Sequence, residues 1–193
     1  MPLKQSLVVV YLLLFVKINY TNIFTTTDMA NFTLPHFGPI DSADLEEYYD
    51  VTIVFSGRPI QIDLNFENKT IDLKQLETAR HFIDNIRIFD INNKGFIADD
   101  YKDNSDTVKF YLKHHLEELG TAELAALLPA GSKKAGHEKL LLQQLHLVRV
   151  GIYPDSSSQF AVFDYSIGKD ITDDLVVLFT DENGNLDYIT MES

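Results

Sequence analysis

The sequence predicts an α+β fold, in which strands from both ends of the chain form one mostly antiparallel sheet that packs on a central helical block. Alternation of apolar and polar residues marks parts of the chain between residues 32 and 66 and again after residue 145. Between these parts, apolar residues recur at intervals of three and four, as on one face of a helix. Strands and helices that are segregated along the chain are typical of α+β proteins.

The N-terminal part is predicted to contain two or three strands. Phe32–Phe37 alternates and stops at Gly38-Pro39, which suggests a short edge strand. Tyr48–Phe55 and Ile60–Phe66 flank the turn residues Ser56 to Pro59 and predict a hairpin. In its second strand the apolar residues share one face, and the opposite face carries Gln61, Asp63 and Asn65.

The helical block begins after the hairpin. Asp72 is the expected N-cap of a first helix. We expect Asn92–Gly95 to end this helix and to separate it from a short second helix that ends near Tyr101. The spacing predicts a third helix over Val108–Leu119, and Gly120 is expected to end it. The residues expected to cap that helix are Asn104, Ser105 and Asp106.

The C-terminal part is predicted to return to strands. Thr121 opens an Ala/Leu-rich turn, 131–136 is expected to form a loop, and His137–Gln143 a short helical piece. Asn183-Gly184 lies between two β-branched or aromatic runs, which is a strong hairpin signal. The four expected strands are Leu145–Tyr153, Phe160–Tyr165, Leu175–Phe179 and Leu186–Met191.

Composition excludes several classes of function. The 193 residues include 16 basic and 29 acidic residues and no Cys, which gives a formal charge of −13. Without Cys the chain has no disulfide, zinc–thiolate site, iron–sulfur cluster or thiol nucleophile. Removing Lys4, Lys17 and Asp28 leaves 14 basic and 28 acidic residues, so residues 29–193 carry −14. This charge argues against nucleic acid, and against an anionic membrane for residues 29–193, because both favour basic patches.

Residues 1–28 form an atypical N-terminal extension, and residues 29–193 are predicted to form a single globular α+β domain. Leu7–Val16 is an apolar run too short to span a membrane. Lys17 follows directly, without a small-x-small cleavage site. Three interpretations stay open: a mis-assigned start with Met29 as the true one, a weak signal or anchor, or a disordered tail. We expect a cytoplasmic protein, or an exported or anchored one if the extension is a real signal.

The known catalytic and cofactor motifs are incomplete in this chain. His137-Glu138 begins like a zinc-protease helix, but Leu141 stands where the second histidine ligand belongs. Gly131 and Gly136 have the spacing of a phosphate-binding loop, but the Lys-Ser/Thr pair after them is missing. We therefore predict no cofactor, no metal site and no catalytic residue.

Histidines and carboxylates leave a hydrolase open as the alternative. His81 and Asp84 are three residues apart on a predicted helix and could share a face. His114 and His115 are expected to point to different sides of their helix, so that they would not serve one site. An Asp/His metal-dependent hydrolase would need a site assembled from residues distant in the sequence.

One group of acidic residues stands near two strand ends. It combines four carboxylates with an aromatic side chain: Asp164, Tyr165, Asp170, Asp173 and Asp174. We interpret these residues as candidates for an acidic, tyrosine-bearing rim that binds a basic protein partner. The simpler interpretation is that they are loop charges exposed to solvent. Tyrosine supplies contact area at low entropic cost, and complementary charge speeds association.

The C-terminal residues carry a resemblance to a known family. The runs that carry it are Ile152–Asp155, Phe163–Gly168, Ile171–Asp173, Gly184–Ile189 and Met191–Ser193, with His36–Gly38 and Ile60–Leu64 nearer the N-terminus. The chain resembles the bacterial family called domain of unknown function two thousand and four, from about residue 32 to residue 193. The resemblance implies a bacterial, cytoplasmic α+β protein, and its extent favours Met29 as the start. It brings no activity and no catalytic residues.

These observations favour a non-enzymatic, acidic protein-binding module of the immunity or adaptor type. Its expected property is stoichiometric, salt-sensitive capture of a basic partner. A purely structural role, which would involve oligomerisation, is a third possibility, and the sequence leaves the oligomeric state open.

Overall fold

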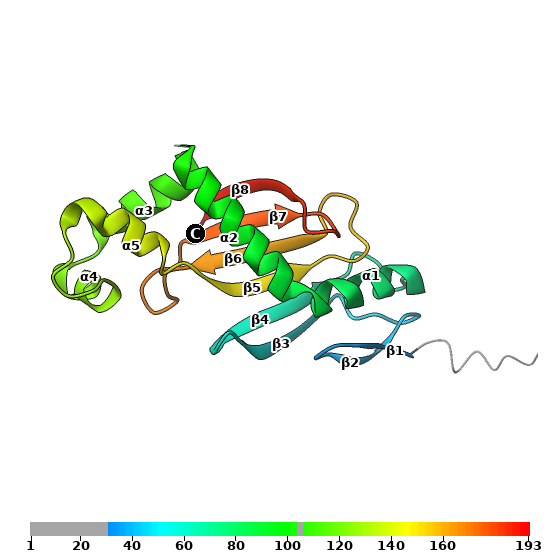
Figure 1. The fold of residues 1–193 in the computed structure, drawn as a ribbon. Coiled ribbons are helices and arrows are strands. Elements are labelled where there is room, and N and C mark those ends of the chain that lie inside the picture. Colours follow the sequence, from blue (N-terminus) through cyan, green and yellow to red (C-terminus); the bar gives the residue numbers. More distant parts are fainter. Residues whose placement is uncertain (1–30, 104–105) are drawn as a thin grey trace, which may run out of the picture.

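The computed structural model of the protein describes residues 31–103 and 106–193, and it shows the α+β class expected from the sequence (Figure 1). The strands are β1 Asn31–Leu34, β2 Gly38–Asp41, β3 Tyr48–Phe55, β4 Arg58–Asn65, β5 His146–Ile152, β6 Ala161–Ser166, β7 Leu175–Thr180 and β8 Leu186–Glu192. The helices are α1 Leu73–Asp84, α2 Ile86–Lys102, α3 Asp106–Glu118, α4 Thr121–Leu127 and α5 His137–Leu142, with a 3₁₀ turn at Lys134–Gly136. The predictions made for residues 1–28, for a start at Met29, and for capping by Asn104 and Ser105 lie outside the described residues.

The first strand prediction needs a correction. Instead of one edge strand over Phe32–Phe37, β1 and β2 form an antiparallel hairpin that is a separate two-stranded sheet. His36 and Gly38 adopt φ values of 69° and 81°, so the chain reverses where alternation suggested continued extension. Leu34 and Ile40 of this hairpin are buried in the main core.

The β3–β4 hairpin is closed by two residues only. Ser56 and Gly57 have φ values of 49° and 83°, and Phe55 pairs with Arg58. Two central residues with positive φ match the twist of the flanking strands, which is why such turns dominate short hairpins. Arg58 and Pro59 therefore belong to β4 rather than to the turn.

The main sheet has six strands in sequence order, β3-β4-β5-β6-β7-β8. All neighbours are antiparallel except β4 and β5, which are parallel. The helical block connects these two strands and returns the chain to the same end of the sheet, as a parallel connection requires.

The helix break lies at Asn85, not at Asn92–Gly95 as the sequence suggested. Asn85 (φ −106°, ψ 7°) ends α1 and begins α2, which continues through 92–95 to Lys102. Packing overrides the weak helix propensity of this stretch, since Phe89 and Ile97 on either side of it are buried in the core. Lys94 also forms an ion pair with Asp90 one turn earlier, at 2.8 Å.

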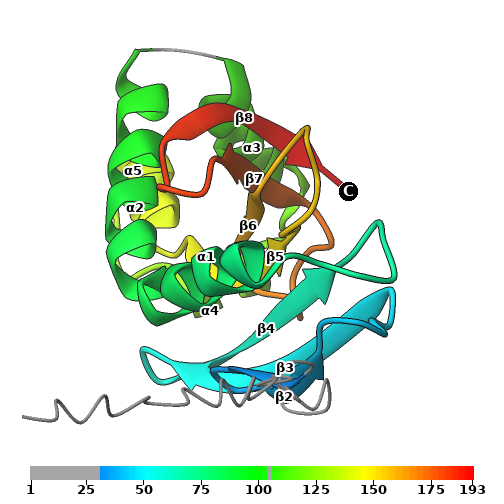
Figure 2. The ribbon, with the colours of Figure 1, turned by 90° about the vertical axis from the view of Figure 1, so that its right-hand side faces the viewer.

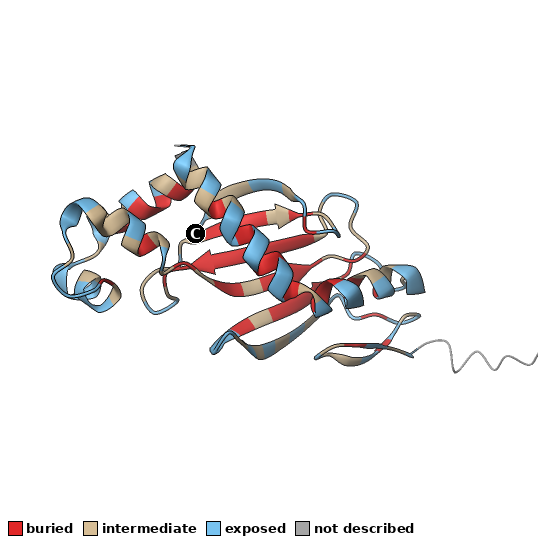
Figure 3. Cartoon of the chain, in the orientation of Figure 1, coloured by how far each residue is buried: buried red, intermediate tan, exposed pale blue. Residues whose placement is uncertain are grey.

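The helices lie on one side of the main sheet (Figure 2). The core between these layers includes Phe82 of α1, Tyr111 of α3 and Phe163 and Tyr165 of β6, all fully buried. Buried residues concentrate in the central strands, whereas exposed residues face outward on the helices and the α4 region (Figure 3). The opposite side of the sheet carries no helix of the described residues, and we call it the open face.

Candidate functional site

The open face is made of side chains that alternate with those of the core. One row across the strands consists of Thr52, Gln61, Arg149, Asp164, Val177 and Thr190. The next row consists of Asp50, Asp63, Gly151, Val162, Phe179 and Tyr188. Partners in register point to the same side of a sheet, so these residues share one surface.

A buried ion cluster crosses three strands in the polar half of this face. The guanidinium of Arg149 donates to both carboxylate oxygens of Asp63, from Nε at 2.6 Å and from Nη2 at 2.8 Å. Its Nη1 donates to Asp164 Oδ2 at 3.1 Å. Asn65 Nδ2 also donates to Asp63, at 2.7 Å. Bidentate arginine–carboxylate pairs are geometrically specific, so the cluster fixes the positions of β4, β5 and β6.

Burial and charge act against each other in this cluster. Burial alone would lower the pKa of Arg149, but the hydrogen bonds and negative charge of Asp63, with the charge of Asp164, raise it. Burial raises the pKa of Asp164, and Arg149 offsets part of that rise. Two carboxylates share one guanidinium, so the ionised cluster carries a net negative charge.

Aromatic side chains occupy both edges of the open face. Phe179 and Tyr188 stack with ring centroids 4.3 Å apart, and Tyr188 is 48% exposed. At the opposite edge Tyr48 is also 48% exposed, and its hydroxyl accepts a hydrogen bond from Gln61 Nε2 at 2.9 Å. Exposed tyrosines of this kind are enriched in protein interfaces.

An acidic segment leads into β3, the edge strand of the sheet. It includes five carboxylates that are all exposed, and we call them the acidic edge: Asp41, Asp44, Glu46, Glu47 and Asp50. None of them forms an ion pair with any side chain of the described residues. With Tyr48 among them, they form an acidic, tyrosine-bearing surface at a different place from the one predicted.

The five residues predicted to form a rim do not lie on one surface. Asp164 is buried in the ion cluster of the open face. Tyr165 is fully buried on the helix side, where its hydroxyl donates to Asp90 of α2 at 3.1 Å. Asp170 and Asp173 are exposed in the β6–β7 loop, and Asp174 is half-buried against α3. The expectation of one continuous rim is therefore corrected, because neighbouring strand residues point to opposite faces.

Asp174 lies beside the two consecutive histidines of α3. His114 Nε2 lies 3.4 Å from Asp174 Oδ2, and His115 Nε2 lies 3.7 Å from the same oxygen. The expectation that the two rings cannot reach one site is therefore wrong. The β6–β7 loop packs against the end of α3, so rings that leave the helix in different directions approach one carboxylate from two sides.

The contacts of His115 fix its tautomer and argue for a structural role. Nδ1 donates to the carbonyl oxygen of Tyr111 at 2.8 Å, so Nε2 accepts the hydroxyl proton of Thr172 at 2.9 Å. A hydroxyl beside an imidazole is the arrangement of an activated nucleophile. The Thr172 oxygen, however, accepts the backbone N–H of Asp174 at 3.0 Å, and the ring is 3% exposed. The group connects α3 to the β6–β7 loop.

The alternative of an Asp/His metal site finds little support in the geometry. The described part of the chain contains no group of three or more His, Asp or Glu side chains that could hold a metal ion. His81 and Asp84 form no ion pair within that part, and the His81 ring lies 3.4 Å from the Asn85 amide instead.

Sequence reasoning missed the ion cluster, although one signal was present. Arg149 interrupts an otherwise apolar strand, and a charge in a buried strand requires a partner. The alternation in the sequence predicts Asp63 on the polar face of its strand. The parallel pairing of β4 with β5, which brings Asp63 to Arg149, depends on how the helical block returns the chain.

Comparisons add no relative from which a role could be transferred. No helix among the described residues is long and apolar enough to cross a membrane. No family model matches the chain, and no curated protein or solved structure matches it either. The resemblance to domain of unknown function two thousand and four therefore stays a prediction.

Proposed function

We propose that the chain is a non-enzymatic protein-binding module, of the immunity or adaptor type, that binds a basic protein through the open face and the acidic edge. The observation that carries this proposal is the open face itself, which combines exposed tyrosines at both edges with a net negative charge. The bacterial, cytoplasmic setting implied by the resemblance belongs to the same proposal.

The charge distribution favours a basic partner over a second copy of this chain. Arg149 is the one cation in the two rows of the open face, and two carboxylates already neutralise it. In a two-fold dimer the same negatively charged patch lies on both subunits, so two surfaces of like net charge would face each other. Like charges in an interface cost several kcal/mol, by rough estimate, whereas a basic partner gains from the same field.

The chemistry of the described side chains favours binding over hydrolysis. The carboxylates of the ion cluster are occupied by Arg149, and the Thr172 hydroxyl is occupied by His115 and a backbone N–H. No group capable of holding a metal is found among the described residues. The geometry therefore supports recognition by shape and charge.

The proposal is tested by neutralising the acidic edge in the full chain. The triple variant Glu46→Gln, Glu47→Gln and Asp50→Asn removes three exposed charges without removing a salt bridge. The tagged full chain is used to capture partners from cells that produce it, at about 0.05 M and about 0.5 M salt. We expect one basic protein in near-equal amount at low salt, its loss at high salt, and its loss from the variant.

A matched control removes the same charge elsewhere. Asp84→Asn, Glu117→Gln and Glu118→Gln neutralise three exposed carboxylates on α1 and α3. The control variant should retain the partner at low salt. Recovery of the chain alone, or equal retention of the partner by both variants, contradicts the proposal.

A further inference from the structure

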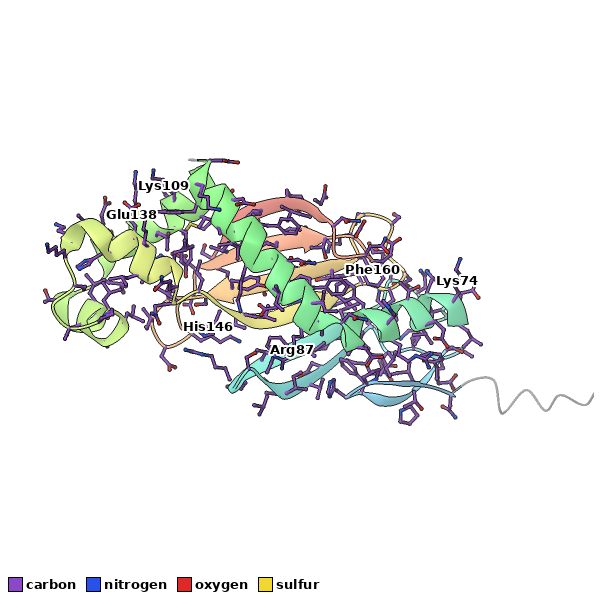
Figure 4. All side chains as sticks on the ribbon, viewed as in Figure 1. Lys74, Arg87, Lys109, Glu138, His146 and Phe160 are labelled. Atoms are coloured by element: carbon purple, nitrogen blue, oxygen red, sulfur yellow. The ribbon has the colours of Figure 1, made fainter. Side chains whose placement is uncertain are left out.

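A pocket of about 520 Å³ lies on the helix side of the sheet, away from the open face. Its walls come from the β3–β4 hairpin, from α2, and from the segment that joins α5 to β5; we call it the α2–β5 pocket. Figure 4 shows the labelled His146 beside the end of that hairpin. Small-molecule sites typically have volumes of about 300–1,000 Å³, so the pocket is large enough for a ligand.

Basic side chains outnumber acidic ones in the lining of the pocket. Arg58, Lys94 and His146 line it, and Asp90 is the one carboxylate among the lining residues. Asp90 is 4% exposed and already satisfied, because Lys94 Nζ donates to one oxygen at 2.8 Å and the Tyr165 hydroxyl donates to the other. With His146 neutral the lining carries a net charge of about +1, in a chain whose net charge is −13.

Arg58 has no carboxylate partner within the described residues. Its Nη1 lies 3.3 Å from Nε2 of His146, and none of the ion pairs of the described residues includes it. His146 Nδ1 donates to the carbonyl oxygen of Gln144 at 2.8 Å, which leaves Nε2 as the acceptor that faces Arg58. The guanidinium therefore has donors available for an anion, and carboxylates are its preferred planar partners.

The remaining lining is largely apolar. Six apolar side chains contribute to the walls: Phe55, Ile97, Ala98, Leu142, Leu145 and Leu147. An apolar pocket with a few convergent polar groups is the usual form of a small-molecule site. The walls can take the apolar body of a ligand whose charged group meets the cations.

We propose that the α2–β5 pocket binds a small organic carboxylate, with its carboxylate held by Arg58 and Lys94 and its apolar body against the aliphatic walls. The net charge of the lining suits a monoanion. The site lies on the helix side, so it is independent of the surface proposed to bind a basic partner.

His146 couples this binding to protons. Burial lowers its pKa, and the charges of Arg58 and Lys94 lower it further, against the Gln144 hydrogen bond that raises it. Asp90, bound to Lys94, is the carboxylate that lines the same pocket. Burial is the larger cause of this lowered pKa, and an anion placed between the cations removes the smaller one, their repulsion of the protonated imidazole. Binding near neutral pH is therefore expected to take up protons.

The test uses titration calorimetry on the full chain with three probes. These are 4-phenylbutyrate, its neutral amide 4-phenylbutanamide, and inorganic phosphate. We expect the carboxylate to bind, and the amide and inorganic phosphate to bind at least about tenfold more weakly, because a charged hydrogen bond and apolar contact each contribute. Equal binding of acid and amide, equal binding of phosphate, or no binding of any probe overturns the proposal.

Variants assign the binding to this pocket. Arg58→Gln should weaken phenylbutyrate binding by about tenfold or more, and Arg58→Lys should restore part of it. Lys74→Gln is the control, since Lys74 is exposed on α1, and Figure 4 shows it at one end of the molecule, away from His146. Unchanged affinity in Arg58→Gln overturns the proposal, and so does an equal loss in Lys74→Gln. The acidic-edge variant should keep phenylbutyrate binding, which separates this test from that of the proposed function.

Proton uptake is measured in the same titrations, in two buffers with different heats of protonation. The heats should differ between buffers for the wild-type chain and should coincide for His146→Gln. Equal heats in the wild-type chain would overturn the role assigned to His146.

Discussion

Gly151 lies where the ion cluster of the open face crosses β5. A Cβ atom on this glycine would lie 2.7 Å from Arg149 Nη2 and 3.2 Å from Asp63 Oδ2. The bidentate pair therefore needs a residue without a side chain at this position. A glycine in a strand usually costs stability, and here it makes the close approach of two charged groups possible.

Alanine at two glycines should have opposite effects on stability. Gly151→Ala is expected to destabilise the fold by about 1–3 kcal/mol, because it displaces Arg149 from Asp63. Gly95→Ala in α2 meets nothing within 4 Å and should stabilise the fold by about 0.5–1 kcal/mol. Urea denaturation measures both changes, and a stable Gly151→Ala protein would show that the pair is not closely packed.

Loops at one end of β4 and β5 are connected by a single carboxylate. Asp155, which follows β5, accepts the backbone N–H groups of Glu67 at 3.1 Å and of Asn68 at 2.9 Å, just after β4. Asn68 Nδ2 donates to it as well, at 3.1 Å. These bonds hold the two loops beside each other where the strands end.

Removing this carboxylate should weaken the fold locally. Asp155→Ala is expected to cost about 1–2 kcal/mol, since several charge-assisted bonds to partly exposed backbone are lost. Asp170→Ala, an exposed acid of the β6–β7 loop, should stay within about 0.5 kcal/mol of the wild type. Equal effects of both substitutions in urea denaturation would contradict the assigned role of Asp155.

Elements with strong local signals could be predicted from the sequence, and their long-range pairings could not. The β3–β4 hairpin followed from alternation and a Gly-containing turn, and the α1 N-cap from Asp72, whose backbone N–H donates to Gln75 Oε1. The break at Asn85 does not follow from the sequence, because the burial of Phe89 and Ile97 in the core outweighs the low helix propensity of the residues between them. Likewise, nothing local in the sequence indicates that Arg149 will meet Asp63.

Two histidines, the buried His115 and the half-buried His146, connect the stability of the whole molecule to pH. Burial lowers the pKa of His115, and burial with nearby positive charge lowers that of His146. The unfolded chain, with histidine pKa values near 6.5, then binds more protons than the folded chain as the pH falls through that value. Stability from this source is present above about pH 6.5 and decreases below it.

The sign of this effect can be measured by urea denaturation at about pH 7.5 and about pH 5.5. The free energy of unfolding should fall toward the lower pH. The decrease in the free energy of unfolding should be smaller in His115→Gln, because this variant lacks one of the two histidines whose pKa is lowered by folding. An identical fall in both proteins would contradict the contribution of His115.

The parallel pairing of β4 with β5 has a further consequence for how the protein folds. Residues 66–145 separate these two strands, whereas every other pair of neighbours in the sheet is joined by a shorter connection. Three polar contacts connect the two sides of this strand pair, and each joins residues that are 86 to 88 positions apart in the sequence: Arg58 with His146, Asp63 with Arg149, and Glu67 with Asp155. Closing so long a loop lowers the entropy of the chain before any contact between the two strands can form. We therefore expect the sheet to fold as two local units, β3–β4 and β5–β8, that dock late and separate first. A carboxylate held by Arg58 of β4 and Lys94 of α2 would slow that separation.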